Sequence, residues 1–278
     1  MMNIKNTVTE TQNPLGFKKE SRLLVEFAIP CVISMLVTAL YNIVDQIFIG
    51  QGVGMLGNAA TNIAFPLSTT CTAISLLLGI GSATNVSLKL GAGREKESAS
   101  YAGCGILLMT ISGIALFAIT TLFLTPMLTF FGATKEVLPY AKQYTRITAI
   151  GFPFLIMNTG MSKLILADGS PRYSMISMLV GAIVNTILDP IFIFGLHMGV
   201  RGAALATIIS QACSCIWVVS FLFGKKTFLK IQRKNMKLEA RIILPSLALG
   251  LATFIMQASE SIITVCFNSS LLKYGADI

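Results

Sequence analysis

Seven long apolar stretches alternate with short polar stretches along the chain. They span residues 23–49, 59–82, 101–125, 141–162, 173–195, 202–223 and 242–268. A helix needs about 20 mostly apolar residues to cross the hydrocarbon core of a bilayer. Backbone groups that face lipid must also find their partners within the helix. The pattern therefore predicts an all-α integral membrane protein with seven transmembrane helices.

The breaks between these stretches carry residues that favour turns. Residues 50–54 form a glycine-rich segment, and residues 91–97 are short and charged. Pro126 and Pro139 bracket a further predicted loop. These signals separate the predicted helices into antiparallel neighbours joined by short connections.

Composition supports the same class of protein. Hydrophobic residues make up 54% of the chain and charged residues 12%, with a mean hydropathy of +0.76, whereas a soluble domain carries about 25% charged residues. The net charge of +9 does not indicate nucleic acid, because the basic residues lie in short connections between apolar stretches. The six cysteines fall inside apolar stretches, as buried hydrophobic residues do. We expect no nucleic-acid partner, no cofactor and no histidine-rich metal site.

The distribution of basic residues predicts the orientation. Sixteen lysines and arginines lie on the side of the N-terminus and only five on the other side. Cytoplasmic loops carry the excess of basic residues, so we expect a multi-pass protein of the plasma membrane with a cytoplasmic N-terminus. The basic segment 226–241 is interpreted as a solvated linker or an amphipathic helix on the membrane surface.

Three acidic residues lie inside predicted spans, namely Asp45, Asp189 and Glu260. A charge within a span is costly and marks a candidate functional site. Asn42 precedes Asp45 by three residues and Asn185 precedes Asp189 by four, so each amide shares a helix face with its acid. Proline directly after Asp189 cannot donate a backbone hydrogen bond, which frees one carbonyl of that helix.

Four polar side chains are predicted to lie at a similar depth in the membrane. In the predicted orientation, Asp45, Asp189, Thr207 and Tyr144 all lie in the outer half of their helices. Carboxylate, amide and carbonyl oxygens on one face suit a proton or a hard monovalent cation. The alternative interpretation is that both acids are satisfied structural groups or are wetted from outside.

A repeat connects the first and seventh stretches. Pro30 precedes Asp45 by 15 residues, and Pro245 precedes Glu260 by the same distance, with an amide residue three before each acid. Both helices run outward, so the pattern indicates a parallel repeat with an offset of 215 residues. We expect a six-helix lobe followed by the first helix of a second, truncated lobe. The predicted units are a cytoplasmic leader at 1–22, the N-terminal lobe at 23–223, a basic inter-lobe linker at 224–241 and the start of the second lobe at 242–278.

Three segments resemble the multidrug and toxin extrusion family: residues 42–50, 185–195 and 199–207. Members of that family export cationic amphipathic drugs in exchange for H⁺ or Na⁺ through two six-helix lobes. The resemblance implies that Asp45, Asn185, Asp189 and Thr207 form a coupling site for H⁺ or Na⁺, with Tyr144 nearby. It also implies an alternative coupling residue on the seventh helix, where Glu260 matches roughly. Membrane lipid and a second lobe are the partners it implies.

Other functions fit less well. A lipid-linked oligosaccharide flippase of the same superfamily lines its cleft with basic residues, whereas the groups inside the spans here are mostly acidic. An intramembrane aspartyl protease would use Asp45 and Asp189, but the second acid lacks the Gly-x-Gly-Asp context of such enzymes. A seven-helix receptor would place the N-terminus outside.

Overall fold

A computed structural model describes residues 19–224, 227–229, 231–232 and 235–273 of the chain. These residues form a helical bundle in which strands are absent. The elements are α1 (Glu20–Val53), α2 (Met55–Gly91), α3 (Glu95–Leu122), α4 (Leu124–Phe130), α5 (Leu138–Ala167), α6 (Pro171–Pro190), the π-helix η2 (Ile191–Gly195), α7 (Val200–Leu222) and α8 (Ala240–Lys273). Within the described part of the chain, seven segments are long and apolar enough to cross a membrane, and they coincide with the seven predicted spans.

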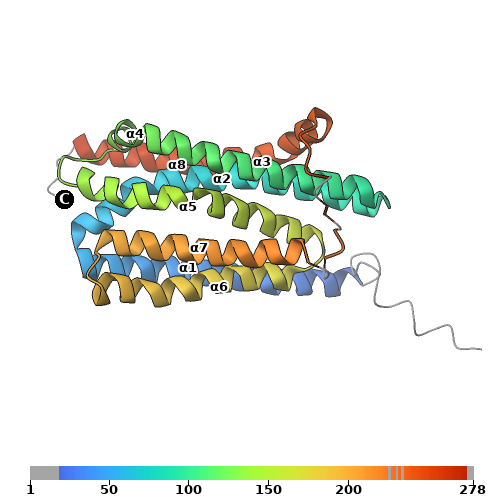
Figure 1. Cartoon of the computed structure of the whole chain (residues 1–278), viewed down its shortest axis with the longest axis horizontal. Coiled ribbons are helices and arrows are strands. Elements are labelled where there is room, and N and C mark those ends of the chain that lie inside the picture. Colours follow the sequence, from blue (N-terminus) through green and yellow to red (C-terminus); the bar gives the residue numbers. More distant parts are fainter. Residues whose placement is uncertain (1–18, 225–226, 230, 233–234, 274–278) are drawn as a thin grey trace, which may run out of the picture.

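The bundle is organised around α5, which packs against α2, α3 and α7 (Figure 1). Large side chains that are fully buried there include Met109, Ile156, Met161 and Leu164. Helix α6 packs against both α7 and α1. Only 6% of the most apolar window of α1 is buried in the structure. Helix α1 is therefore held mainly through α6, and most of its surface is left to lipid or to another chain.

Two predicted breaks differ from the observed ones. Helix α1 continues through Gly50 and Gly52, and the chain breaks only at Gly54, whose φ of +83° favours glycine. A glycine inside a helix costs only about 1 kcal/mol, which is less than leaving backbone groups unpaired near lipid. The predicted loop after α3 likewise contains a short helix, α4, and Pro139 lies in the first turn of α5 rather than in the loop.

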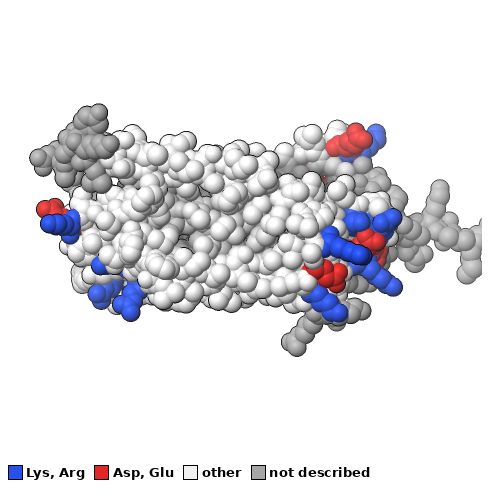
Figure 2. Space-filling view, turned by 90° about the horizontal axis from the view of Figure 1, so that it is seen from above, with Lys and Arg blue, Asp and Glu red and all other residues white. Residues whose placement is uncertain are grey.

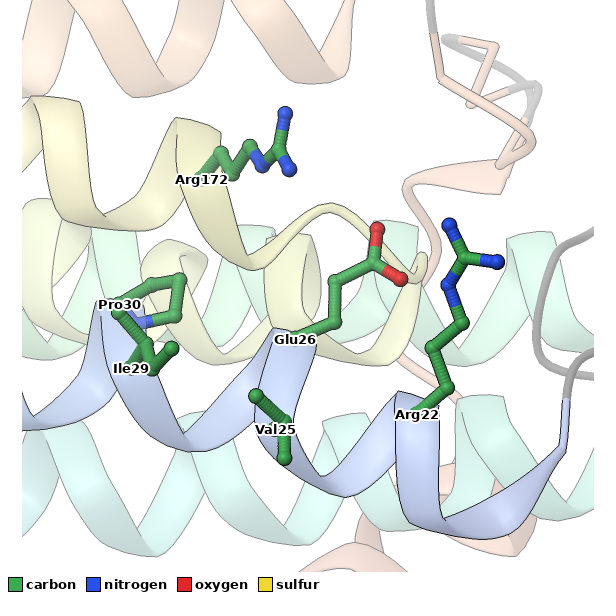
Figure 3. Close-up of a pocket in the computed structure, with 6 residues that line it drawn as sticks. All are labelled: Arg22, Val25, Glu26, Ile29, Pro30 and Arg172. Atoms are coloured by element: carbon green, nitrogen blue, oxygen red, sulfur yellow. The ribbon is translucent and has the colours of Figure 1, made fainter.

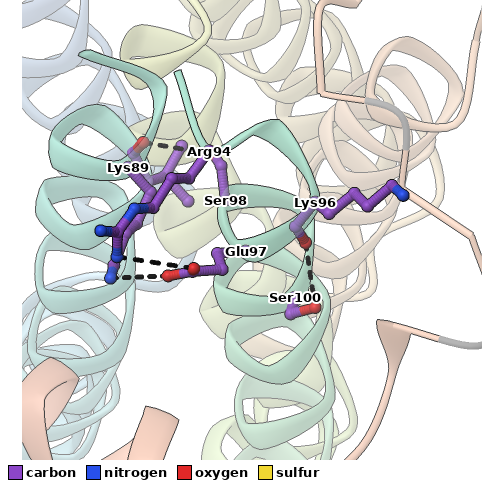
Figure 4. A network of polar contacts seen from close by, with 7 residues as sticks. Lys89, Arg94, Lys96, Glu97, Ser98 and Ser100 are labelled. Atoms are coloured by element: carbon purple, nitrogen blue, oxygen red, sulfur yellow. Dashed lines mark hydrogen bonds and ion pairs between the residues drawn. The ribbon is translucent and has the colours of Figure 1, made fainter. Parts of the chain in front are cut away.

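On the face that Figure 2 shows, charged side chains gather at the two ends of the bundle and an uncharged band separates them. At one end, Nζ of Lys89 lies 2.7 Å from Oε2 of Glu97 across the connection between α2 and α3 (Figure 4). Arg94 approaches the same carboxylate at 3.6 Å. These ion pairs lie where α2 ends and α3 begins, as expected for groups placed at the surface of a membrane.

The connection between α7 and α8 is built into the same end of the bundle. Leu229 is 1% exposed and packs in the main core. Its backbone N–H donates to Oδ1 of Asp168 (2.8 Å), and the hydroxyl of Thr227 donates to the same oxygen (3.0 Å). Burial raises the pKa of Asp168 to about 6, although these hydrogen bonds act in the opposite direction. The described part of the predicted linker is thus anchored to the loop between α5 and α6 and is not an amphipathic surface helix.

Helix α8 packs antiparallel along α2. The two backbones approach so closely that a methyl group on Gly81 would overlap the carbonyl oxygen of Ser246, and one on Gly250 would overlap that of Leu77. Hydroxyl groups of Thr69 and Ser261 lie 2.5 Å apart in the same contact. The first helix of the predicted second lobe is therefore fixed to the first lobe through a seam of small residues, as is common for helices in membranes.

Candidate functional site

Two acidic side chains from different helices meet inside the bundle. Asp45 lies on α1 and Asp189 at the C-terminal end of α6, 144 positions apart in the sequence. Their carboxyl groups lie within hydrogen-bonding reach of one another. Asp189 is fully buried and Asp45 is partly buried. Two carboxylates in contact repel each other unless a proton or a cation lies between them.

Buried oxygen atoms at this site lack donors. The side-chain amide of Asn185 donates to Oδ1 of Asp189 at 3.4 Å. Oδ1 of Asp45, Oδ2 of Asp189 and Oδ1 of Asn185 are buried without a hydrogen-bond partner among the described residues. Buried acceptors without a donor are costly and rare in folded proteins. Three such oxygens beside one another are suited to hold a proton or a small cation.

Hydroxyl groups from three helices surround the acids. Tyr41 of α1 and Tyr144 of α5 both lie close enough to Asp45 and Asp189 to feel their charge. The hydroxyl of Tyr144 is within hydrogen-bonding reach of Thr207 on α7. Thr207 also donates to the carbonyl oxygen of Ala203 at 2.9 Å. The structure thus brings together Asp45, Asn185, Asp189, Thr207 and Tyr144, the five side chains that the sequence groups by depth and by family resemblance.

Apolar residues close the site toward the nearby end of the bundle. Helix α6 ends at Pro190, and the chain continues as the π-helix η2, which is consistent with the hydrogen bond that proline cannot donate. This irregular turn places Ile193 against Ile49 of α1 and Ala203 of α7, all three buried. Tyr144 packs against this cluster, so apolar side chains adjoin the site on that side.

Asn42, predicted to share a face with Asp45, does not join this site, and Glu260, the predicted alternative coupling residue of the seventh helix, lies outside it. Asn42 is exposed on α1, so its side chain does not share the buried face of Asp45. Glu260 is exposed on α8, where it accepts a hydrogen bond from Gln257. Sequence reasoning also missed Tyr41, although its position four residues before Asp45 on one helix was a usable signal.

The chemistry of this arrangement is that of cation binding. Carboxylate, amide and hydroxyl oxygens are ligands for protons and for hard cations such as Na⁺. Clusters of three or more histidine, cysteine or acidic side chains, which a transition metal would need, are absent from the described residues. The oxygens of the site come from four helices, α1, α5, α6 and α7.

Comparison with known proteins places the chain among membrane exporters. The MatE family model matches residues 30–191. Multidrug export protein MepA of Staphylococcus haemolyticus is 29% identical over 254 residues, which cover 91% of this chain and 56% of the relative. MepA of Staphylococcus aureus strain NCTC 8325 is 26% identical over the same shares. The chain thus spans about half the length of the curated relatives it matches.

Solved structures show the same architecture. The MATE multidrug transporter DinF-BH, solved in complex with a ligand, superimposes with a TM-score of 0.91 at 34% identity, over 96% of this chain and 60% of that one. A MOP superfamily transporter from Pyrococcus furiosus, described as having a binding pocket of reverse polarity, superimposes with a TM-score of 0.84 at 27% identity. That match covers 91% of this chain and 56% of the other.

Proposed function

The chain belongs to the MatE family, and from this premise we propose that it forms the cation-binding lobe of a two-lobed drug exporter driven by H⁺ or Na⁺. Members of the family are transporters rather than enzymes, so Asp45 and Asp189 are not the catalytic pair of a protease. The seven apolar helices make the chain a multi-pass membrane protein.

The contact between Asp45 and Asp189 carries this proposal. One acid belongs to α1 and the other to α6, so a proton or Na⁺ bound between them links the two helices. When the ion leaves, the carboxylates repel each other and the attachment of α1 weakens. Few residues of α1 are buried elsewhere, so little else opposes its movement. Ion binding would in this way be coupled to the shape of the face that meets the second lobe.

The sign of the buried charges favours cationic substrates. Asp45 and Asp189 are acidic, whereas a flippase for a pyrophosphate-linked lipid needs basic groups facing its cleft. An acidic interior attracts an organic cation and releases it when a proton or Na⁺ takes its place. The relatives are named as multidrug export proteins, which also supports drug efflux over lipid flipping.

Drug efflux from loaded cells tests this function. A longer protein that contains this chain and a second lobe is expressed in cells that lack their own exporters, and the cells are loaded with ethidium. We expect efflux that is fast and stops when an ionophore collapses the H⁺ or the Na⁺ gradient, whichever drives it. Efflux equal to that of cells with an empty vector, or efflux indifferent to both ionophores, would contradict the proposal.

The orientation is proposed from the excess of basic residues on the side of the N-terminus. A cysteine at Lys96, in the first turn of α3, should be shielded from an impermeant thiol reagent in intact cells. A cysteine at Lys135, between α4 and α5, should react. Both are placed in a chain whose six native cysteines have been replaced. Permeabilised cells provide the control, since both positions should then react, and the reverse pattern in intact cells would overturn the orientation.

A further inference from the structure

A cavity of about 310 Å³ lies between α1 and α6, at the end of the bundle opposite the acidic site (Figure 3). Arg22 and Glu26 of α1 and Arg172 of α6 provide its charged lining. Val25 and Ile29 provide an apolar side and are each more than half exposed. The cavity therefore joins a basic mouth to an apolar surface that continues along a membrane-spanning helix.

Both arginines are available to a ligand. Arg22 and Arg172 are exposed, and neither forms an ion pair with another described residue. The carboxylate of Glu26 lies between the two arginines (Figure 3). Two guanidinium groups against one carboxylate leave the mouth with a net positive charge. Guanidinium groups bind phosphate oxygens through paired, charge-assisted hydrogen bonds.

The apolar residues beside the arginines indicate which phosphate-containing ligand fits the cavity. An exposed valine and isoleucine in the same cavity as two arginines suit an amphipathic ligand with an anionic head and an apolar tail. Basic pockets between transmembrane helices at the cytoplasmic surface bind anionic lipid head groups. We propose that this cavity binds the phosphodiester head group of an anionic phospholipid, with its acyl chains lying along Val25 and Ile29. In the orientation proposed above, the lipid belongs to the cytoplasmic leaflet.

Such a lipid would bridge the two helices that also carry the acids. Arg22 lies on α1 with Asp45, and Arg172 lies on α6 with Asp189. The phosphate would hold the helices together at one end while the acids join or part them at the other. Lipid binding itself is independent of transport, so it can be tested and can fail separately from the proposed function.

Native mass spectrometry of the purified chain in detergent tests the site. The probe is phosphatidylglycerol, compared with phosphatidylcholine, whose head group carries no net charge. We expect phosphatidylglycerol to be retained more strongly, and its apparent affinity to fall about tenfold or more in the Arg22→Gln/Arg172→Gln double variant. Arg241→Gln is the matched control, because Arg241 is exposed at the same end of the bundle but does not line the cavity.

One further variant and one competition measurement test the assignment of the ligand. Val25→Glu adds a carboxylate to the cavity near the end of α1, where the side chain can reach the membrane surface, and it should lower phosphatidylglycerol binding as the double variant does. Inorganic phosphate at millimolar concentration should not displace the lipid, because it lacks the apolar part. Displacement by phosphate would overturn the lipid assignment in favour of a free phosphate. Equal binding by the wild-type chain and the double variant would overturn the site.

Discussion

Asp189→Asn is expected to reduce ethidium efflux to the level of cells without an exporter, while the amount of protein in the membrane stays near normal. Asn keeps the size of the side chain but cannot carry the charge that a transported proton or Na⁺ neutralises. Asp189 is fully buried, and an oxygen of its carboxyl group has no partner among the described residues. Removing the charge from one of two acids in contact relieves their repulsion, so the stability should be unchanged or increased.

Matched variants separate a coupling role from a structural one. Asp45→Asn should abolish efflux in the same way, and the double variant should be no worse than either single one, because the two acids act as a unit. Asn42→Ala on α1 is the control, since Asn42 is polar and only three residues from Asp45 but exposed and outside the site. Efflux at the wild-type rate by Asp189→Asn would mean that the carboxyl group is a structural element only.

The position of the acids can be predicted because helix geometry is regular. Counting residues from the ends of the spans places Asp45, Asp189, Thr207 and Tyr144 at one depth, and the helices then bring that depth together. Depth does not specify which face of a helix is buried. The spacing of three residues predicts a shared face for Asn42 and Asp45, yet Asn42 is exposed, and the count overlooks Tyr41 although that residue lies beside both acids.

The packing of irregular and terminal segments is less accessible from the sequence. Long apolar stretches predict seven helices, but the burial of Leu229 depends on Asp168, a contact that is 61 residues distant in the chain. The basic residues of that segment indicate a solvated linker or an amphipathic surface helix, because the sequence shows its charge but not its distant partner. The glycines of α2 and α8 are similarly ambiguous, since a glycine in a membrane helix marks a turn, a kink or a close approach, and only the partner helix decides.

Gly81→Leu is expected to push α8 away from α2, because the backbones of these two helices approach closely at Gly81. A side chain at this position would collide with the carbonyl oxygen of Ser246, which belongs to backbone and cannot rotate away. Lipid solvates apolar side chains as well as protein does, so helices in a membrane associate mainly through packing and polar contacts. Separating the helices would also break the contacts of Ser246 with Asn85 and of Ser261 with Thr69. We expect overpacking alone to lower the free energy of unfolding by about 1–3 kcal/mol.

A disulfide reports directly whether α8 stays on α2. Thr69→Cys and Ser261→Cys are introduced into the chain without its native cysteines, because the two native hydroxyl groups lie 2.5 Å apart. Mild oxidation should cross-link this pair efficiently, and a protease site inserted between α7 and α8 makes the cross-link visible on a gel. Gly81→Leu should lower the yield several-fold, and Gly250→Leu should do so from the other helix, since a side chain there would meet the carbonyl oxygen of Leu77. Gly91→Leu is the control, because a side chain at that end of α2 would point into open space. Cross-linking that survives both Gly81→Leu and Gly250→Leu would mean that the glycine seam does not fix the position of α8.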